Sequence, residues 1–298
     1  MELFVHSGDE TIASVEPESL QILTYLHLSE IPKNELTVTT SCLPWKSPTS
    51  EYPVLREGSV IISGSEAIIL YLKEHGYNID KIVPSFDEGE TIAYGALLKD
   101  KLFPAILYLQ WLETQNYVEV TRKWYGKVLY FPLSIFIPTW KHNTWQRRLM
   151  EDTPQDYVQQ KGIELLKRAE DGITCLSSRL GEKDYFFGNN PSSLDALVFG
   201  CLEVIIQQWS SENNSLARQL HACTNLKQFC NRIHQNCFPA LKPRALQVVT
   251  PTPSKPLWKD PALWLWVFAA AGILCLQGVR VGLFRRIRSL GQQTHVRN

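Results

Sequence analysis

The chain contains no Cys-x-x-Cys pair and none of the short motifs that mark many catalytic or nucleotide-binding sites. G-x-S-x-G, H-E-x-x-H, the phosphate-binding loop and the dinucleotide fingerprint are all missing. Seven cysteines scattered over 298 residues do not form a secreted disulfide framework, which favours a reducing, cytosol-facing location. We therefore expect neither a cofactor nor a metal, and no enzymatic activity.

A surplus of charge of one sign is also missing. The 30 basic side chains match 30 acidic ones, which removes the electrostatic argument for a nucleic-acid partner. This neutrality is an average, because five arginines and no acid follow residue 279, and residues 1–279 carry five more acidic than basic side chains. With 44% apolar and 20% charged residues, most of the chain is expected to fold.

One long apolar run stands near the C-terminus, whereas the N-terminus has no basic region and too short an apolar run for a signal peptide. Residues 261–279 hold no charge, and these 19 residues reach about 28 Å as a helix, close to the thickness of a bilayer core. Residues 261–279 are therefore predicted to be a transmembrane tail anchor rather than a buried core helix. The side chains expected to fix it in the membrane are Trp264, Trp266, Gly278, Arg280, Arg285, Arg286 and Arg288.

The segments around the span complete this prediction. Five prolines between residues 239 and 256 indicate that residues 239–260 form an extended tether. Residues 280–298 form a basic tail, and a short span with a basic tail favours the mitochondrial outer membrane. We expect the large N-terminal part to stay in the cytosol, because a folded domain cannot cross.

Strand and helix patterns divide the folded part into two domains. Short strands at residues 2–6, 35–40 and 60–62 alternate with helical patterns at 18–28 and 65–72, which predicts a thioredoxin-like domain over residues 1–83. Pro53 stands just before a strand and suits a cis-proline, although the isomer stays open.

From residue 88 long helical patterns dominate and predict an all-helical domain over residues 88–238. Ser192 and Asp195 have the spacing of a capping box before an apolar helix, which should be central. The fold class is therefore α/β plus all-α, with a C-terminal transmembrane helix.

This architecture resembles the glutathione transferase superfamily, as do Tyr52-Pro53, Gly64-Ser65 and Phe187-Gly188 with Ser192-x-x-Asp195. The block from Asn116 to Tyr125, followed by Phe131-Pro132-Leu133 and Tyr185-Phe-Phe-Gly188, resembles the metaxin family more closely. The intact Asn116 block and the expected anchor resemble the tail-anchored first paralogue rather than the unanchored forms.

The resemblance implies a non-catalytic subunit of the mitochondrial outer-membrane sorting and assembly machinery, which supports the insertion of β-barrel proteins. It also implies three partners: a second metaxin, the β-barrel assembly channel and, indirectly, the cristae-organising complex. Two alternatives stay open, a membrane-tethered glutathione-dependent transferase and a motor or membrane-contact adaptor.

The enzyme alternative depends on three positions. An active glutathione transferase needs a hydroxyl or thiol after the first strand, and Ser7 is available there. It also needs an acid and a serine at the start of the helix after the last strand, but only Ser65 is present and Gly64 takes the place of the acid. Losing that charge-assisted bond costs about 1.5 to 3 kcal/mol. The sequence therefore favours an adaptor in which Ser7 is a turn residue.

Two further groups of residues combine side chains that can bind a metal or a partner. Cys223, Cys230 and Cys237 recur every seven residues with His234 nearby, which suits core packing better than a metal or redox site. The segment Arg122-Lys123-Trp124-Tyr125 combines residues enriched in interface hot spots and is the candidate partner interface. Interdomain packing of the same segment stays an equal alternative, and the other histidines show no ligand or triad spacing.

Overall fold

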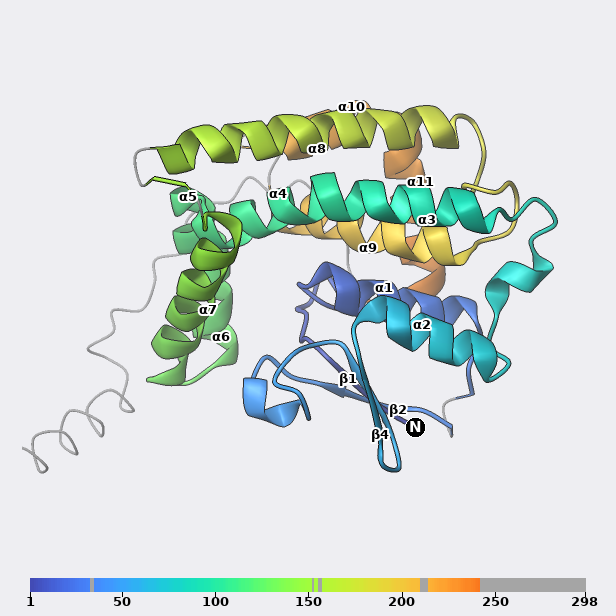
Figure 1. Cartoon of the computed structure of the whole chain (residues 1–298), viewed down its shortest axis with the longest axis horizontal. Helices are drawn as coiled ribbons and strands as arrows, with labels where there is room; N and C mark the ends of the chain where they lie inside the picture. The colour runs from blue at the N-terminus through green and yellow to red at the C-terminus, as the bar shows by residue number, and fades with distance from the viewer. Residues whose placement is uncertain (33–34, 152, 155–156, 210–213, 242–298) are drawn as a thin grey trace, which may run out of the picture. The chain divides into compact units, whose positions relative to one another are not determined.

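The computed structural model describes residues 1–32, 35–151, 153–154, 157–209 and 214–241 (Figure 1). The predicted span, the basic tail and most of the tether lie outside these residues. Within the described part of the chain, no helix is both long and apolar enough to cross a bilayer. The described residues fall into two compact units, one made of Met1–Trp124 and the chain from Phe136 onward, the other containing Tyr125–Ile135.

The N-terminal residues form the predicted thioredoxin-like arrangement. A four-stranded sheet has the order β2-β1-β3-β4, with β1 parallel to β2 and antiparallel to β3, and with β3 antiparallel to β4. Its strands are β1 (Glu2–Val5), β2 (Thr37–Thr40), β3 (Val54–Glu57) and β4 (Val60–Ser63). The Tyr52-Pro53 bond before β3 is cis.

Two helices cover one face of this sheet (Figure 1). They are α1 (Pro17–Leu28) and α2 (Ser65–Glu74), and short helical turns η1 (Pro44–Lys46) and η2 (Ile79–Ile82) lie in the connections. A core cluster that includes Leu3, Val5, Leu55 and Ile68 fills the space between sheet and helices. Because β1, α1 and α2 share this core, the end of β1 and the starts of both helices lie at the same end of the sheet.

From Glu88 the described chain is mainly helical, as predicted, with connecting loops and one isolated β-bridge between Tyr185 and Gly188. Residues Glu88 to Thr121 combine α-helical with π-helical turns, and longer α-helices follow. These elements are α3 (Glu88–Leu97), η3 (Leu98–Leu102), α4 (Phe103–Leu107), η4 (Tyr108–Leu112), α5 (Thr114–Asn116), η5 (Tyr117–Thr121), α6 (Arg122–Val128), α7 (Leu133–Leu149), α8 (Val158–Leu180), α9 (Ser193–Gln208), α10 (Ser215–Ala222) and α11 (Thr224–Cys237).

Helix α9 is the central element, as its apolar sequence predicts, because nearly every residue along it is buried. The predicted capping box is confirmed at its start: the Ser192 backbone N–H donates to Asp195 over 2.7 Å, and the Phe186 N–H donates to the same carboxylate over 2.9 Å. Burial raises the pKa of Asp195 to about 6. Gly200 lets α9 approach α1 closely, since a Cβ there would lie 2.7 Å from the carbonyl oxygen of Pro17.

A second carboxylate at the start of α9 ties the helical part to the sheet. Asp80, in η2, accepts hydrogen bonds from the Ser193 backbone N–H at 2.7 Å and from the Ser193 hydroxyl at 2.8 Å. Lys73 Nζ of α2 lies 2.6 Å from Asp80 Oδ2, the oxygen that also accepts from the Ser193 hydroxyl. These buried contacts fix α2 and α9 relative to each other.

Candidate functional site

The loop after β1 carries Ser7, the residue at which the resemblance places a catalytic hydroxyl. The loop folds back tightly, because a Cβ on Gly8 would lie 1.9 Å from the Ile12 carbonyl oxygen. The Val15 N–H donates to the Ser7 carbonyl over 3.3 Å, and His6 Nδ1 lies 3.0 Å from the same oxygen. Through its backbone, Ser7 holds this turn closed, which agrees with its interpretation as a turn residue.

A carboxylate of the protein itself faces the start of α2. Burial raises the pKa of Glu18, in the first turn of α1, and the neighbouring Lys99 and the Ser65 amide partly oppose this rise. A helix N-terminus normally offers such an amide to an anionic ligand. Here a carboxylate of the chain stands near the amide that would bind an incoming carboxylate.

The residue before Ser65 is unsuited to the missing acid. Gly64 has φ of +90°, a backbone conformation that favours glycine over residues with a side chain. Space is not the obstacle, because a Cβ built on Gly64 meets nothing within 4 Å. The position therefore combines an absent acid with a carboxylate of the chain near the Ser65 amide.

A buried charged cluster lies beside this position. His6, at the end of β1, is fully buried, and its Nε2 lies 3.7 Å from Glu16 Oε1. Lys141 of α7 lies 2.8 Å from the same carboxylate oxygen. Burial lowers the pKa of His6 to about 4, so the imidazole is neutral near pH 7. Burial alone would raise the pKa of Glu16, but the charge and hydrogen bond of Lys141 help to hold it below its usual value.

Aromatic rings surround the cluster. The His6 ring lies 5.4 Å from the Trp124 ring and 5.9 Å from that of Tyr52, and Lys141 Nζ lies 5.7 Å from the centre of the Trp111 ring. The cluster ties β1, the start of α1 and α7 together by charge and packing. Sequence spacing did not reveal it, because His6 and Lys141 are more than a hundred positions apart.

The predicted interface segment divides into two halves. Arg122 and Lys123 are exposed, whereas Trp124 is partly buried against the large helical core and Tyr125 is buried. The cations can therefore meet a partner, while Trp124 serves the packing that was the alternative interpretation. The interface role of the segment stays a prediction.

The cysteine and histidine stripe is part of the helical core. Cys230 and Cys237 are buried in α11, and burial raises the pKa of both thiols, that of Cys237 to about 12. His234 Nδ1 lies 2.7 Å from the buried carboxylate of Glu203. Among the residues that the structure describes, no three histidine, cysteine or acidic side chains are placed to hold a metal ion. Buried thiols of raised pKa suit core packing.

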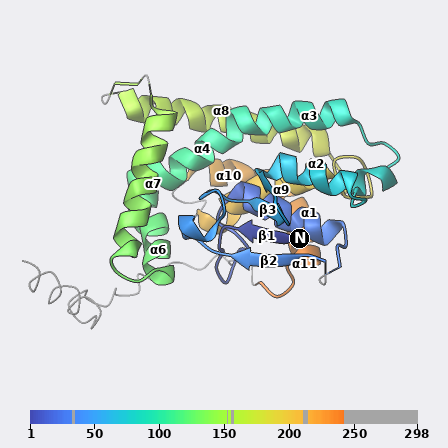
Figure 2. The ribbon, with the colours of Figure 1, turned by 60° about the horizontal axis from the view of Figure 1, so that its bottom comes forward.

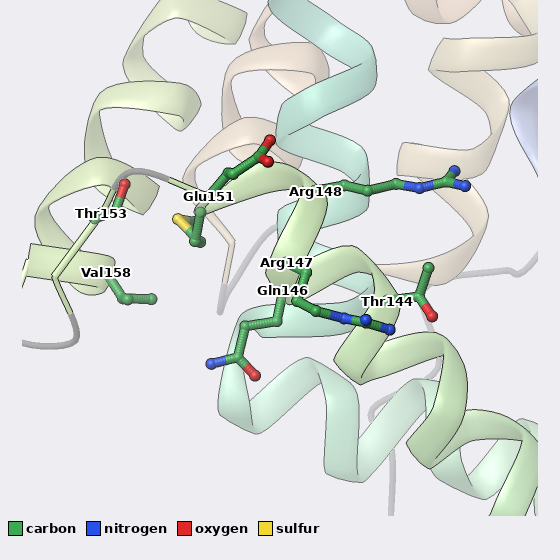
Figure 3. A pocket seen from close by; sticks show the side chains of 8 residues that line it. Thr144, Gln146, Arg147, Arg148, Glu151, Thr153 and Val158 are labelled. Carbon is green, nitrogen blue, oxygen red and sulfur yellow. The ribbon is translucent and has the colours of Figure 1, made fainter.

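An open hollow of about 700 Å³ lies where α7 ends and α8 begins (Figure 3). Arg147, Arg148, Gln146 and Glu151 line it, but Figure 3 shows their side chains pointing in different directions. Arg147 Nε donates to the Asn143 carbonyl, 3.3 Å away. Because the polar groups do not converge, the hollow lacks the geometry of a small-molecule site.

Solved structures with this architecture define the class of fold. A glutathione S-transferase of Ceriporiopsis subvermispora in complex with glutathione matches with a TM-score of 0.54 at 14% identity, over 82% of this chain and 99% of that one. A beta-etherase of Sphingobium sp. strain SYK-6 matches with a TM-score of 0.52 at 15% identity, over 80% and 96% of the two chains. The chain therefore has a glutathione-transferase-like fold.

Sequence comparison narrows this class to a family. Metaxin-1 of Macaca fascicularis is 36% identical over 244 residues, covering 80% of this chain and 75% of the relative. Metaxin-3 of Xenopus laevis is 33% identical over 236 residues, covering 78% and 75%. Residues 19–142 match the family described as outer mitochondrial membrane transport complex protein, and residues 169–233 match the glutathione S-transferase C-terminal domain. The chain belongs to the metaxin family, as its sequence motifs predict.

Proposed function

We propose that the chain is a non-catalytic subunit of the sorting and assembly machinery in the mitochondrial outer membrane, where it supports the insertion of β-barrel proteins. Membership in a family of outer-membrane transport components supports this role. The observation that carries the non-catalytic part is Gly64 at the place of the glutamyl-binding acid, with the Glu18 carboxylate near the start of the same helix. A carboxylate there would repel the γ-glutamyl carboxylate of glutathione.

The attachment to the membrane is part of the same proposal. Residues 261–279 form the anchor, Trp264 and Trp266 mark one interface, and Arg280 with the basic tail marks the other. Residues 239–260 connect the anchor to the domains at 1–83 and 88–238, which face the cytosol. A tethered domain raises the local concentration of its surface near neighbouring membrane complexes.

A reporter fusion tests the anchor. Residues 257–298 fused to a fluorescent protein should take it to mitochondria, and the chain without them should be released by alkaline extraction. Replacing Arg280, Arg285, Arg286 and Arg288 with Ser should shift part of the reporter to other membranes. A cytosolic reporter, or a truncated chain that resists extraction, would show that the anchor lies elsewhere.

Depletion tests the role in barrel assembly. The steady-state level of outer-membrane barrels such as the voltage-dependent anion channel should fall, while matrix precursors are still imported. The full chain should restore assembly, and the chain lacking residues 257–298 should restore less. Co-purification with a second metaxin, the barrel-assembly channel and, more weakly, the cristae-organising complex is expected. Normal barrel assembly kinetics in depleted mitochondria would contradict the proposal and favour a motor or membrane-contact adaptor.

A further inference from the structure

Helix α7 presents an exposed face with two large aromatic side chains. Phe136 is 68% exposed and Trp140 is 51% exposed, four residues apart on the same side of the helix. Arg147 continues this side two turns further on and is exposed. Figure 2 shows α7 at a steep angle to α3 and α8, beyond the end of α4. Phe136, Trp140 and Arg147 together form the α7 face.

The opposite side of α7 is fixed to the fold. Ile137 and Pro138 are buried, Lys141 pairs with Glu16, and His142 Nδ1 lies 2.6 Å from the Trp111 carbonyl oxygen. The exposure of the α7 face is therefore set by contacts on the other side of the helix. Because the fold keeps Phe136 and Trp140 exposed to solvent, these two large aromatic side chains form a candidate contact surface.

The charge of α7 differs from that of the chain around it. Its 17 residues contain no aspartate or glutamate; Lys141 is paired with Glu16 on the fixed side, whereas Arg147 and Arg148 are exposed. The remainder of residues 1–279 has an acidic excess. An anionic surface would therefore repel most of the folded part and attract α7. Phosphate groups attract such basic positions, and tryptophan rings favour the headgroup level of a bilayer.

We propose that the α7 face is a peripheral contact with the anionic phospholipid surface of the outer membrane. The proposal rests on the proposed membrane attachment, which keeps the folded part within reach of that surface. A bilayer suits this face better than a protein does, because a stable protein interface buries about 800 Å² per partner, and one helix edge with three outward side chains offers far less. A tethered domain needs only a weak contact of this kind, since it does not leave the membrane.

Photo-crosslinking to lipid tests the contact. The full chain is reconstituted in vesicles of phosphatidylcholine alone or of equal parts phosphatidylcholine and phosphatidylglycerol, with a trace of phospholipid carrying a diazirine. Crosslinked peptides are then mapped by mass spectrometry. Peptides of α7 should be labelled at least about threefold more in the anionic vesicles, because each arginine near such a surface adds attraction.

Variants distinguish a specific lipid contact of the α7 face from nonspecific adsorption of exposed apolar side chains. Phe136→Ser with Trp140→Ser should reduce the labelling of α7 to background, and Arg147→Ser should remove most of its dependence on phosphatidylglycerol. The control is Ile92→Ser with Ile163→Ser, which removes side chains that are 66% and 68% exposed on α3 and α8 and should leave α7 labelling unchanged. All variants should keep the melting temperature of the wild type, since the changed side chains are exposed.

The outcomes distinguish this contact from the anchor. The α7 proposal would be overturned if labelling were confined to residues 261–279. It would also be overturned if the labelling of α7 were the same with either lipid headgroup and in every variant. Neither result would contradict the anchor. Labelling of α7 in a chain that alkaline treatment strips from the vesicles would support the contact and reject the anchor. A photoreactive amino acid at position 140 that captures a protein in intact mitochondria would show that a protein covers this face instead.

Discussion

The Glu18 carboxylate, in the first turn of α1, lies near the Ser65 amide at the start of α2, where burial raises the pKa of Glu18. Glu18→Ala removes this negative charge from beside a helix N-terminus. We expect glutathione to bind the variant more tightly than the wild type, by up to about tenfold, because its γ-glutamyl carboxylate no longer meets a like charge there. Titration calorimetry measures this difference.

Conjugation should stay at background in both proteins, because Gly64 cannot supply the acid. Glu10→Ala, which removes an exposed carboxylate in the loop between β1 and α1, is the matched control and should not change binding. Low-micromolar binding by the wild type, with turnover that Ser7→Ala abolishes, would favour the transferase alternative over the adaptor.

Asp80→Ala should cost about 3 kcal/mol of unfolding free energy. The change leaves Lys73 without its carboxylate and removes the acceptor for both Ser193 groups at the start of α9. Asp100→Ala is the control, because its pair with Arg168 is exposed and should contribute less than about 1 kcal/mol. Denaturant unfolding of the full chain in mild detergent measures both, and equal losses would contradict the structural role of Asp80.

Gly200→Ala should destabilise the fold by about 1 to 3 kcal/mol. The added methyl would lie 2.7 Å from the Pro17 carbonyl oxygen and 3.0 Å from the Gln21 backbone nitrogen, so α9 must move away from α1. Gly95→Ala on α3 meets only a side chain at 3.7 Å and should be neutral or slightly stabilising, since alanine favours helix. Thermal unfolding that ranks the two variants in the reverse order would be inconsistent with this packing.

These features show which parts of the fold the sequence could predict. The capping box of Ser192 and Asp195 lies within four residues, and the helix it starts is apolar throughout, so local pattern sufficed. Asp80 contacts Ser193, and His6 contacts Glu16. Each contact joins two different elements of the fold, and no periodicity in the sequence predicts it. The position of Glu18 near the start of α2 likewise depends on how α1 and α2 pack, which no local pattern shows. The apolar pattern from residue 88 predicts helix, but it does not distinguish the π-helical turns between Leu98 and Thr121 from α-helical ones.

His6 should make stability depend on pH in a defined direction. Burial lowers its pKa from 6.5 to about 4, so between these values the unfolded chain binds a proton that the folded chain does not. The stabilisation from His6 is therefore complete above pH 6.5 and is lost as the pH falls to 4. The total change is about 3 kcal/mol.

The comparison with His6→Gln isolates this contribution. The difference in unfolding free energy between wild type and variant should grow by about 3 kcal/mol from pH 4 to pH 6.5 and then stay constant. Asp195 acts in the opposite direction, because burial raises its pKa to about 6, but it is present in both proteins and cancels. A difference that is flat across this range would mean that His6 is not neutral in the folded chain.

The segment Arg122-Lys123-Trp124-Tyr125 should separate into binding and packing residues. Arg122→Ser with Lys123→Ser changes exposed cations, so unfolding free energy should stay within about 0.5 kcal/mol while co-purification of the second metaxin falls. Trp124→Ala removes a ring that packs on the helical core and on His6, so it should lower stability by about 3 kcal/mol. Lys81→Ser with Lys167→Ser, two exposed lysines elsewhere, controls for charge alone. If the partner is retained by the Arg122 and Lys123 variant and lost in the Lys81 and Lys167 control, the interface lies outside α6.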